Sequence, residues 1–299
     1  MVGSDTPVGQ ALCDYLSQRD SDFIGLSKSD CRWKSERQAK KSLRRSECEF
    51  VVDTRLQAAA DGGIKVHEID VERSLWLARA CQALKMPLML LSCARVFRGR
   101  ESSVYREEDY PDGDSTIARL LIAAEAAVRD HCERHVILRT GPVFASAGIN
   151  VITHMLDQLH QGGTLMVSRQ RRGCPIAAED AARVVSGMLD QFGCGLENWG
   201  IYHYCSVDMT NCYEFAEVLL ASASQYEAFG LDDADILAPE EEPLPLELSL
   251  DCGKIRDTFA IKQQPWRASV AGHVKQYYSD YMSRENAGGE SYRHNDASS

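Results

Sequence analysis

The chain has 299 residues, of which 44% are hydrophobic and 26% are charged, a composition typical of a globular protein with one main domain and a smaller lobe. The formal net charge of -11 and the pI near 5.2 argue against nucleic acid and anionic membranes as general partners. No apolar run approaches the roughly 20 residues of a membrane-spanning helix, and the first residues do not form a signal peptide, so we expect a cytoplasmic protein.

The 11 cysteines are scattered along the chain. They form no C-x-x-C pair and no cluster with histidine at zinc-binding spacing, and the closest two are Cys205 and Cys212. We therefore expect reduced thiols packed as small apolar side chains, and no metal site.

A glycine turn that leads into a helix stands at the start of the chain, where Gly3-Ser-Asp-Thr-Pro-Val-Gly9 precedes the apolar pattern of Gln10 to Leu16. Glycines serve in such turns because backbone N–H groups and a helix N-terminus must approach a pyrophosphate closely. The turn resembles the Gly-x-x-Gly-x-x-Gly fingerprint of dinucleotide-binding proteins, with a threonine in the middle place, although only two residues precede it where a complete strand is expected. The predicted cofactor-binding residues are Gly3, Thr6, Pro7, Val8 and Gly9.

The segment Asp20 to Leu26 is predicted to be the second strand, and it ends without the acidic residue that would bind an adenosine ribose. The cations Lys28, Arg32 and Lys34 follow it. If a dinucleotide binds, these cations favour NADP over NAD, because they suit a 2'-phosphate. The alternative is a solvated charge run on a short helix.

A third strand, Glu49 to Arg55, contains Asp53, whose carboxylate would repel a pyrophosphate beside it. The helix predicted after it runs from Val66 to Leu84, with Leu77 and Cys81 on its buried side.

The central stretch of the chain predicts a strand, a helix and another strand. Leu88 to Ser92 is a continuous apolar run, typical of a strand buried on both faces of a parallel sheet. The helix Ile117 to about Cys132 follows, with Ser115 or Thr116 as its cap, and His135 to Phe144 supplies the next strand.

Two motifs in this stretch, Ser92-Cys-Ala-Arg-Val-Phe97 and Arg139-Thr-Gly-Pro-Val-Phe144, resemble the dTDP-4-dehydrorhamnose reductase (RmlD-like) family of extended short-chain dehydrogenases. The family has Ser-Thr-Asp-Tyr-Val-Phe and Arg-Thr-x-x-Val-Phe/Tyr at these places. The resemblance implies an α/β protein with a Rossmann-type, doubly wound parallel sheet and a smaller C-terminal substrate-binding lobe. We expect the first domain over 1–145 with a return segment near 177–200, the lobe over 146–285, and a disordered tail over 286–299.

The reacting residues of the family are missing from this sequence. Ile117 and Leu121 replace the tyrosine and lysine of its Tyr-x-x-x-Lys pair, and Cys93 replaces a threonine. A tyrosine delivers a proton near neutral pH only if a neighbouring cation stabilises its phenolate, and neither aliphatic side chain can do either. No tyrosine of the chain has a lysine four residues later, so no catalytic residue is predicted to be intact. The family's Asn-Ala-Ala segment is likewise replaced, by Asp53-Thr-Arg55.

In the C-terminal part, Gly200-Ile-Tyr-His-Tyr-Cys205 and the helix Asn211 to Leu219 also match the family. His203 lies in the first of these motifs, and we expect it to be structural rather than an acid or base.

The first functional hypothesis is a nucleotide- or nucleotide-sugar-binding member of this family that is catalytically impaired and has a regulatory or scaffolding role, with a homodimer or another protein as partner. The alternative is an active NAD(P)H-dependent 4-keto reductase or epimerase that uses Cys93, Tyr105 or a bound water as proton donor. In a third hypothesis Cys93 is a nucleophile that acts with His131 or His135.

Overall fold

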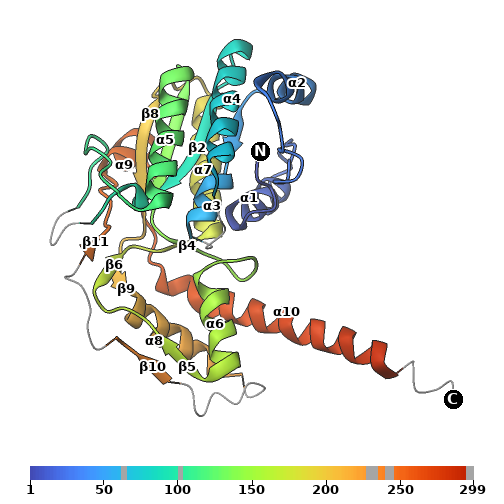
Figure 1. Cartoon of the computed structure of the whole chain (residues 1–299), viewed down its shortest axis with the longest axis vertical. Coiled ribbons are helices and arrows are strands. Elements are labelled where there is room, and N and C mark those ends of the chain that lie inside the picture. The colour runs from blue at the N-terminus through green and yellow to red at the C-terminus, as the bar shows by residue number, and fades with distance from the viewer. Residues whose placement is uncertain (62–65, 100–103, 227–234, 240–245, 294–299) are drawn as a thin grey trace.

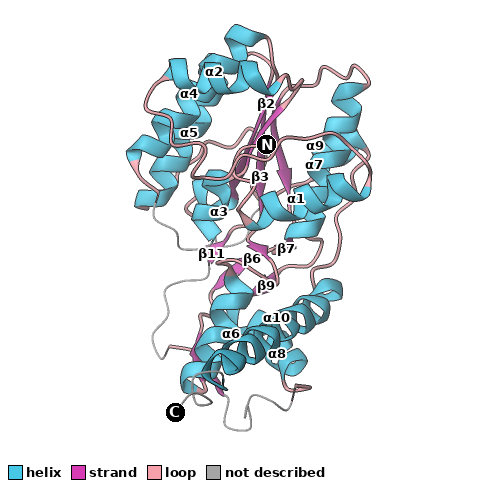
Figure 2. Ribbon diagram, turned by 90° about the vertical axis from the view of Figure 1, so that its right-hand side faces the viewer, coloured by secondary structure: helices cyan, strands magenta, loops and turns pink. Residues whose placement is uncertain are grey.

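The computed structural model describes residues 1–61, 66–99, 104–226, 235–239 and 246–293. Its larger part is a parallel sheet covered by helices on both faces (Figures 1 and 2). The elements of this part are α1 (Pro7–Gln18), α2 (Glu36–Ser46), β1 (Val51–Asp53), α3 (Arg55–Asp61), α4 (Glu68–Leu84), β2 (Leu88–Cys93), the short 3-10 helix η1 (Ala94–Val96), α5 (Thr116–His131), β3 (His135–Thr140), α7 (Ala178–Gly193), β8 (Gly200–Tyr204) and α9 (Gly253–Phe259).

The sheet has the order β1-β2-β3-β8, with every pair parallel. Val2 extends it by single bridges to Asp53 on one side and to Leu26 on the other. Helices α2, α4 and α5 cover one face, and α1, α7 and α9 cover the opposite face (Figure 2). This confirms the predicted α/β class with a doubly wound, Rossmann-type sheet.

The central elements form as the apolar pattern predicts. All six residues of β2 are buried, because helices cover both faces of the strand. In α5, Ser115 is the N-cap and its hydroxyl accepts a hydrogen bond from the N–H of Ala118. The face of α5 that carries Leu121, Ala124 and Val128 is buried.

The smaller part lies at the carboxyl end of the sheet and is mainly helical (Figure 1). Helices α6, α8 and α10 pack together around a second cluster of buried apolar side chains, which includes Phe144, Phe215 and Trp266. The elements of this part are β4 (Val143–Phe144), α6 (Val151–Gly162), β5 (Thr164–Met166), β6 (Arg171–Gly173), β7 (Ile176–Ala177), β9 (Thr210–Asn211), α8 (Cys212–Ala223), β10 (Asp235–Leu237), β11 (Leu246–Glu247) and α10 (Arg267–Arg293).

The smaller part contains three small sheets: β4 with β7, β11 with β6 and β9, and β5 with β10. The first two lie directly below the main sheet, whereas β5 and β10 lie at the far end of the smaller part (Figure 1). In the described part of the chain, no helix is both long and apolar enough to cross a membrane.

Several predicted boundaries differ from the structure. The strand predicted over Glu49 to Arg55 spans only Val51–Asp53, because Arg55 begins α3. The second strand, predicted over Asp20 to Leu26, is reduced to the bridge at Leu26, since the strand beside it contributes only Val2 to the pairing. The strand predicted over His135 to Phe144 stops at Thr140, because Gly141-Pro142 turns the chain into a separate sheet. Helix α10 continues to Arg293, beyond the predicted start of the tail at residue 286, since extending an existing helix needs no new nucleation. Residues 294–299 of that tail lie outside the described residues.

Candidate functional site

A cavity of about 240 Å³ lies where the carboxyl end of β2 meets the smaller part. Cys93 and Arg95 line it from β2 and η1, and Arg171 and Arg172 line it from β6. The smaller part adds Asn211, the N-cap of α8. We call this cavity the arginine pocket.

Three guanidinium groups give the arginine pocket its charge. Arg95, Arg171 and Arg172 all line the pocket, and all three residues are exposed. Arg172 also faces Glu247 of the paired strand β11, with 4.0 Å between nitrogen and oxygen. Guanidinium groups bind phosphate oxygens in a planar, two-pronged geometry, so the arrangement suits a ligand with phosphate groups.

The positions predicted to replace the catalytic residues differ in whether they line the pocket. Cys93 lines the arginine pocket, but Leu121 is buried in the main core and Ile117 packs against that core. Among the described residues that line the pocket there is no tyrosine, histidine, aspartate or glutamate. Within these described lining residues, no such side chain from another element stands in for the family's tyrosine.

Neither tyrosine of the loop before α5 supplies such an acid. Tyr105 is fully buried and stacks on Phe97 with 3.9 Å between ring centroids, and its hydroxyl accepts a hydrogen bond from the N–H of Gly99. Tyr110 is 82% exposed. Tyr105 therefore packs in the interior, and Tyr110 contacts solvent.

His203 belongs to a buried network under the same loop. Its Nε2 lies 3.4 Å from the Nη1 of Arg139, and its Nδ1 lies 3.2 Å from the carbonyl oxygen of Tyr105. Burial, together with the charge of Arg139, lowers the pKa of His203 to about 3. The ring is therefore neutral near pH 7, so that Nε2 accepts from Arg139 and Nδ1 donates to Tyr105, which supports the structural role.

Arg139 is held by a second partner that sequence reasoning missed. The carboxylate of Glu125 on α5 accepts hydrogen bonds from Arg139 on β3, at 2.7 Å from Nη2 and 3.1 Å from Nε. The two side chains are 1% and 2% exposed. The signal in the sequence was a single glutamate on the apolar face of the helix.

The geometry excludes the pairing of Cys93 with His131 or His135. In the parallel pair of β2 and β3, His135 faces Leu88 while Cys93 faces Thr140, so the two residues lie at opposite ends of the sheet, roughly 17 Å apart at 3.3 Å per residue. His131 ends α5, and its Nδ1 lies 3.1 Å from the carbonyl oxygen of Ala127.

The predicted cofactor-binding residues form a turn and the first turn of α1. Gly3 has a φ of +89°, a conformation that favours glycine, and the Thr6 side chain caps α1 by accepting from the N–H of Gly9. Pro7 is the first helical residue, and Val8 and Gly9 are buried. Of the predicted 2'-phosphate cations, Lys28 is half-buried, whereas Arg32 and Lys34 are exposed.

A second, wider cavity of about 900 Å³ lies between α7 and the start of α10. Its charged groups are paired with one another: Glu179 faces His273 at 3.2 Å, and Asp180 bonds both Arg183 and the hydroxyl of Tyr204. The arginine pocket is the stronger candidate for an anionic ligand, because its described lining has three arginines and no carboxylate. Within the described ranges, no group of three or more His, Cys, Asp or Glu residues could hold a metal ion.

Comparisons with known proteins agree with this architecture. A family model described as the RmlD substrate binding domain matches residues 1–279. A dTDP-4-dehydrorhamnose reductase from Sinorhizobium fredii is 28% identical over 201 residues, which are 65% of this chain and 67% of that protein.

Solved structures of reductases share the fold. One from Clostridium acetobutylicum has a TM-score of 0.75 at 18% identity, covering 92% of this chain and 97% of its own. Another, from Bacillus anthracis in complex with NADP, has a TM-score of 0.73 at 16% identity, covering 93% and 97%.

Proposed function

Because the chain belongs to the RmlD substrate-binding family, we propose that it binds a nucleotide or nucleotide sugar, reduces ketones poorly or not at all, and serves in regulation or as a scaffold. The observation that carries the proposal is the arginine pocket, which combines three cations with a lining that lacks the carboxylate, histidine or tyrosine of a proton relay among its described residues. The pocket thus supports the binding of an anionic ligand, but it does not support the delivery of a proton to a ketone.

The pocket's own residues suit a diphosphate. Arg171 and Arg172 are adjacent on β6 and approach from the smaller part, while Arg95 approaches from the end of β2. A diphosphate between them would be neutralised by charge-assisted hydrogen bonds. The apolar side chains of Met155 and Phe215 line the remaining surface, and they could pack against a base or sugar ring.

Calorimetric titration with dTDP tests the binding half of the proposal. Replacing the two cations of β6 together, Arg171→Gln with Arg172→Gln, should weaken dTDP binding at least about tenfold, the equivalent of 1.4 kcal/mol. Arg256→Gln is the matched control, since Arg256 is exposed on α9 and pairs with Asp257. Equal affinity for dTDP in the wild type, the double variant and the control would contradict the assignment of the pocket.

The second part of the proposal concerns a nicotinamide dinucleotide, the cofactor of this family. The Bacillus anthracis neighbour is in complex with NADP, and a nicotinamide dinucleotide supplies the hydride in ketone reduction. If this chain binds a dinucleotide, the contacts would come from the Gly3 to Gly9 turn, and Lys28, Arg32 and Lys34 would favour NADP over NAD. The proton would still have to come from the protein or from water.

An active 4-keto reductase or epimerase is the second candidate, and the position of Cys93 favours it. Cys93 is the one residue among the three replaced catalytic positions that lines the arginine pocket. Its thiol is a weaker donor than a hydroxyl. If this candidate is right, NADPH-dependent turnover exists and Cys93→Ala abolishes it; if turnover is absent, or survives Cys93→Ala unchanged, the thiol is not the donor.

The proposed division has a domain over 1–145 with a return segment near 177–200, and a lobe over 146–285. Two separate clusters of buried apolar side chains support two parts, and the cluster of the larger part also includes residues of β8 and α9. The 11 cysteines all lie in the described part of the chain and form no disulfide there, which fits the proposed cytoplasmic location, a reducing compartment. A homodimer or a protein partner is the assembly through which a scaffold would act, and cross-linking of the purified chain would test it.

A further inference from the structure

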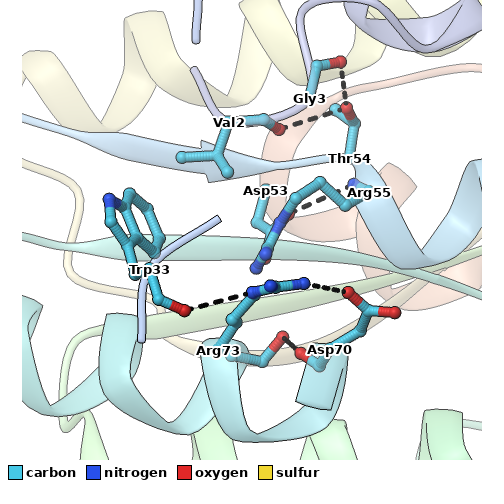
Figure 3. Close-up of polar contacts among 9 residues, drawn as sticks. Val2, Gly3, Trp33, Asp53, Thr54, Arg55, Asp70 and Arg73 are labelled. Carbon is cyan, nitrogen blue, oxygen red and sulfur yellow. Dashed lines mark hydrogen bonds and ion pairs between the residues drawn. The ribbon is translucent and has the colours of Figure 1, made fainter. Parts of the chain in front are cut away.

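The place where a dinucleotide would bind is defined by the sheet. In open α/β sheets, ligands bind beyond the carboxyl ends of neighbouring strands, where the strand order reverses. Here that point lies between Val2 and β1, since Val2 is bridged to Leu26 on one side and to Asp53 on the other. The glycine turn and the Asp53–Arg55 segment leave the sheet together at this point (Figure 3).

Four N–H groups of the glycine turn are already engaged within the protein. A pyrophosphate needs such donors free at the helix N-terminus. Pro7, the first residue of α1, has no N–H at all. The N–H groups of Gly3 and Ser4 both donate to the carbonyl of Leu26. The N–H of Thr6 donates to the carbonyl of Gly3, and the N–H of Gly9 donates to the Thr6 hydroxyl.

The side chains of the Asp53–Arg55 segment lie directly against this turn. A Cβ at Gly3 would lie 2.6 Å from the Thr54 hydroxyl oxygen and 3.0 Å from Cγ of Arg55. The Thr54 and Thr6 hydroxyls are 2.7 Å apart, and Thr54 also donates to the carbonyl of Gly3 at 2.9 Å. Family members that have alanines in this segment would leave that space open.

Arg55 is fixed in its position by several contacts. Its guanidinium donates two hydrogen bonds to Asp53, at 2.9 and 2.7 Å, and the two side chains are 5% and 1% exposed. It also lies over the ring of Trp33, 5.9 Å from the centroid. The carbonyl of Trp33 accepts from Arg73, which is paired with Asp70 at 2.9 Å (Figure 3).

A further carboxylate lies in the turn itself. Asp5 is exposed, and its oxygen accepts the N–H of Lys28 at 2.7 Å. Its negative charge would repel a pyrophosphate at the same turn. The residues present therefore do not fit the cofactor of the family.

We propose that the Asp53–Arg55 segment, packed against the glycine turn, occupies the space of the adenosine and pyrophosphate and so lowers the affinity of this chain for NADPH and NADH. The arginine pocket is formed by other residues, so it can bind its ligand without a dinucleotide.

The test restores the family's residues and measures dinucleotide binding alone. The triple variant Asp53→Asn, Thr54→Ala and Arg55→Ala removes both members of the buried ion pair together, which avoids an uncompensated buried charge. By titration of NADPH fluorescence, this variant should bind at least about tenfold more tightly than the wild type. The control Arg256→Ala with Asp257→Asn removes an exposed pair far from the turn and should bind as the wild type does.

A folded triple variant with the Kd of the wild type, or a weaker one, overturns the inference. If the triple variant does not fold, Thr6→Gly with Thr54→Ala decides, because it removes the paired hydroxyls and frees the N–H of Gly9. The same tenfold criterion applies to it. Since dTDP is absent from these titrations, failure of the arginine pocket would leave their outcome unchanged.

Discussion

At the residue scale, His203 shows how burial converts a reactive side chain into a structural one. The ring is neutral because a proton on it would be desolvated and would face Arg139. In the unfolded chain its pKa returns to about 6.5. Between pH 6.5 and about 3 the unfolded state therefore binds a proton that the folded state does not.

This difference predicts a pH dependence of stability. The contribution of His203 is complete above pH 6.5 and declines as the pH falls, by at most about 1.4 kcal/mol per pH unit. Urea unfolding between pH 7 and pH 5 should show a smaller decline for His203→Gln than for the wild type. His154→Gln, at an exposed position, is the control and should retain the slope of the wild type. Identical slopes for all three proteins would show that His203 titrates alike in both states.

The cysteines give a second prediction at this scale. Burial raises the pKa of Cys31 to about 12 and that of Cys132 to about 11, whereas Cys194 is exposed. Because the thiolate is the nucleophile, iodoacetamide should modify Cys194 first in the native protein, and Cys194→Ser should remove this fast reaction. Mass spectrometry of the labelled peptides checks it. Labelling of Cys31 or Cys132 at the rate of Cys194 would contradict the packing described here.

Some of the residues at the candidate site could be identified from the sequence, and others could not. Ile117 and Leu121 are visible as aliphatic residues at motif positions without any structure. Arg171 and Arg172 are adjacent in the sequence, but their common pocket with Arg95 arises only when β6 comes to lie below the end of β2. A pocket brings together residues that are far apart in the chain, and the periodicity of apolar residues along the sequence does not indicate which of them will meet.

At the scale of elements, the ion pair of Glu125 and Arg139 connects α5 to β3 through the core. Breaking a buried pair leaves one charge uncompensated, so Glu125→Ala should lower the free energy of unfolding by about 3–5 kcal/mol. Asp130→Asn removes an exposed partner of Arg129 on the same helix and should cost about 1 kcal/mol or less. Urea denaturation measures both values. A loss for Glu125→Ala as small as that for Asp130→Asn would argue against the pair as described.

The elements that were predicted well are those that local pattern determines. β2 is a continuous apolar run, and α5 has both a capping serine and an apolar face. The second strand was predicted too long because strand pairing depends on a partner, and Val2 alone pairs there with Leu26. The end of α10 was predicted too early because polar composition does not stop a helix that has already formed.

At the scale of the whole molecule, the fold follows from the order of elements, and family membership follows from the match over residues 1–279. Function does not follow in the same way, since one scaffold supports several chemistries. Two sites on this scaffold depart from the family in different ways. In the proposals made above, apolar packing of Ile117 and Leu121 replaces the proton relay, and the Asp53–Arg55 segment fills the dinucleotide site.

The most direct test of impaired reduction is NADPH consumption by the purified chain with a dTDP-4-keto sugar, followed by absorbance beside a reductase of the family as positive control. With aliphatic side chains at both relay positions, we predict no consumption above the rate without protein. Rapid, substrate-dependent oxidation of NADPH by this chain would contradict the account.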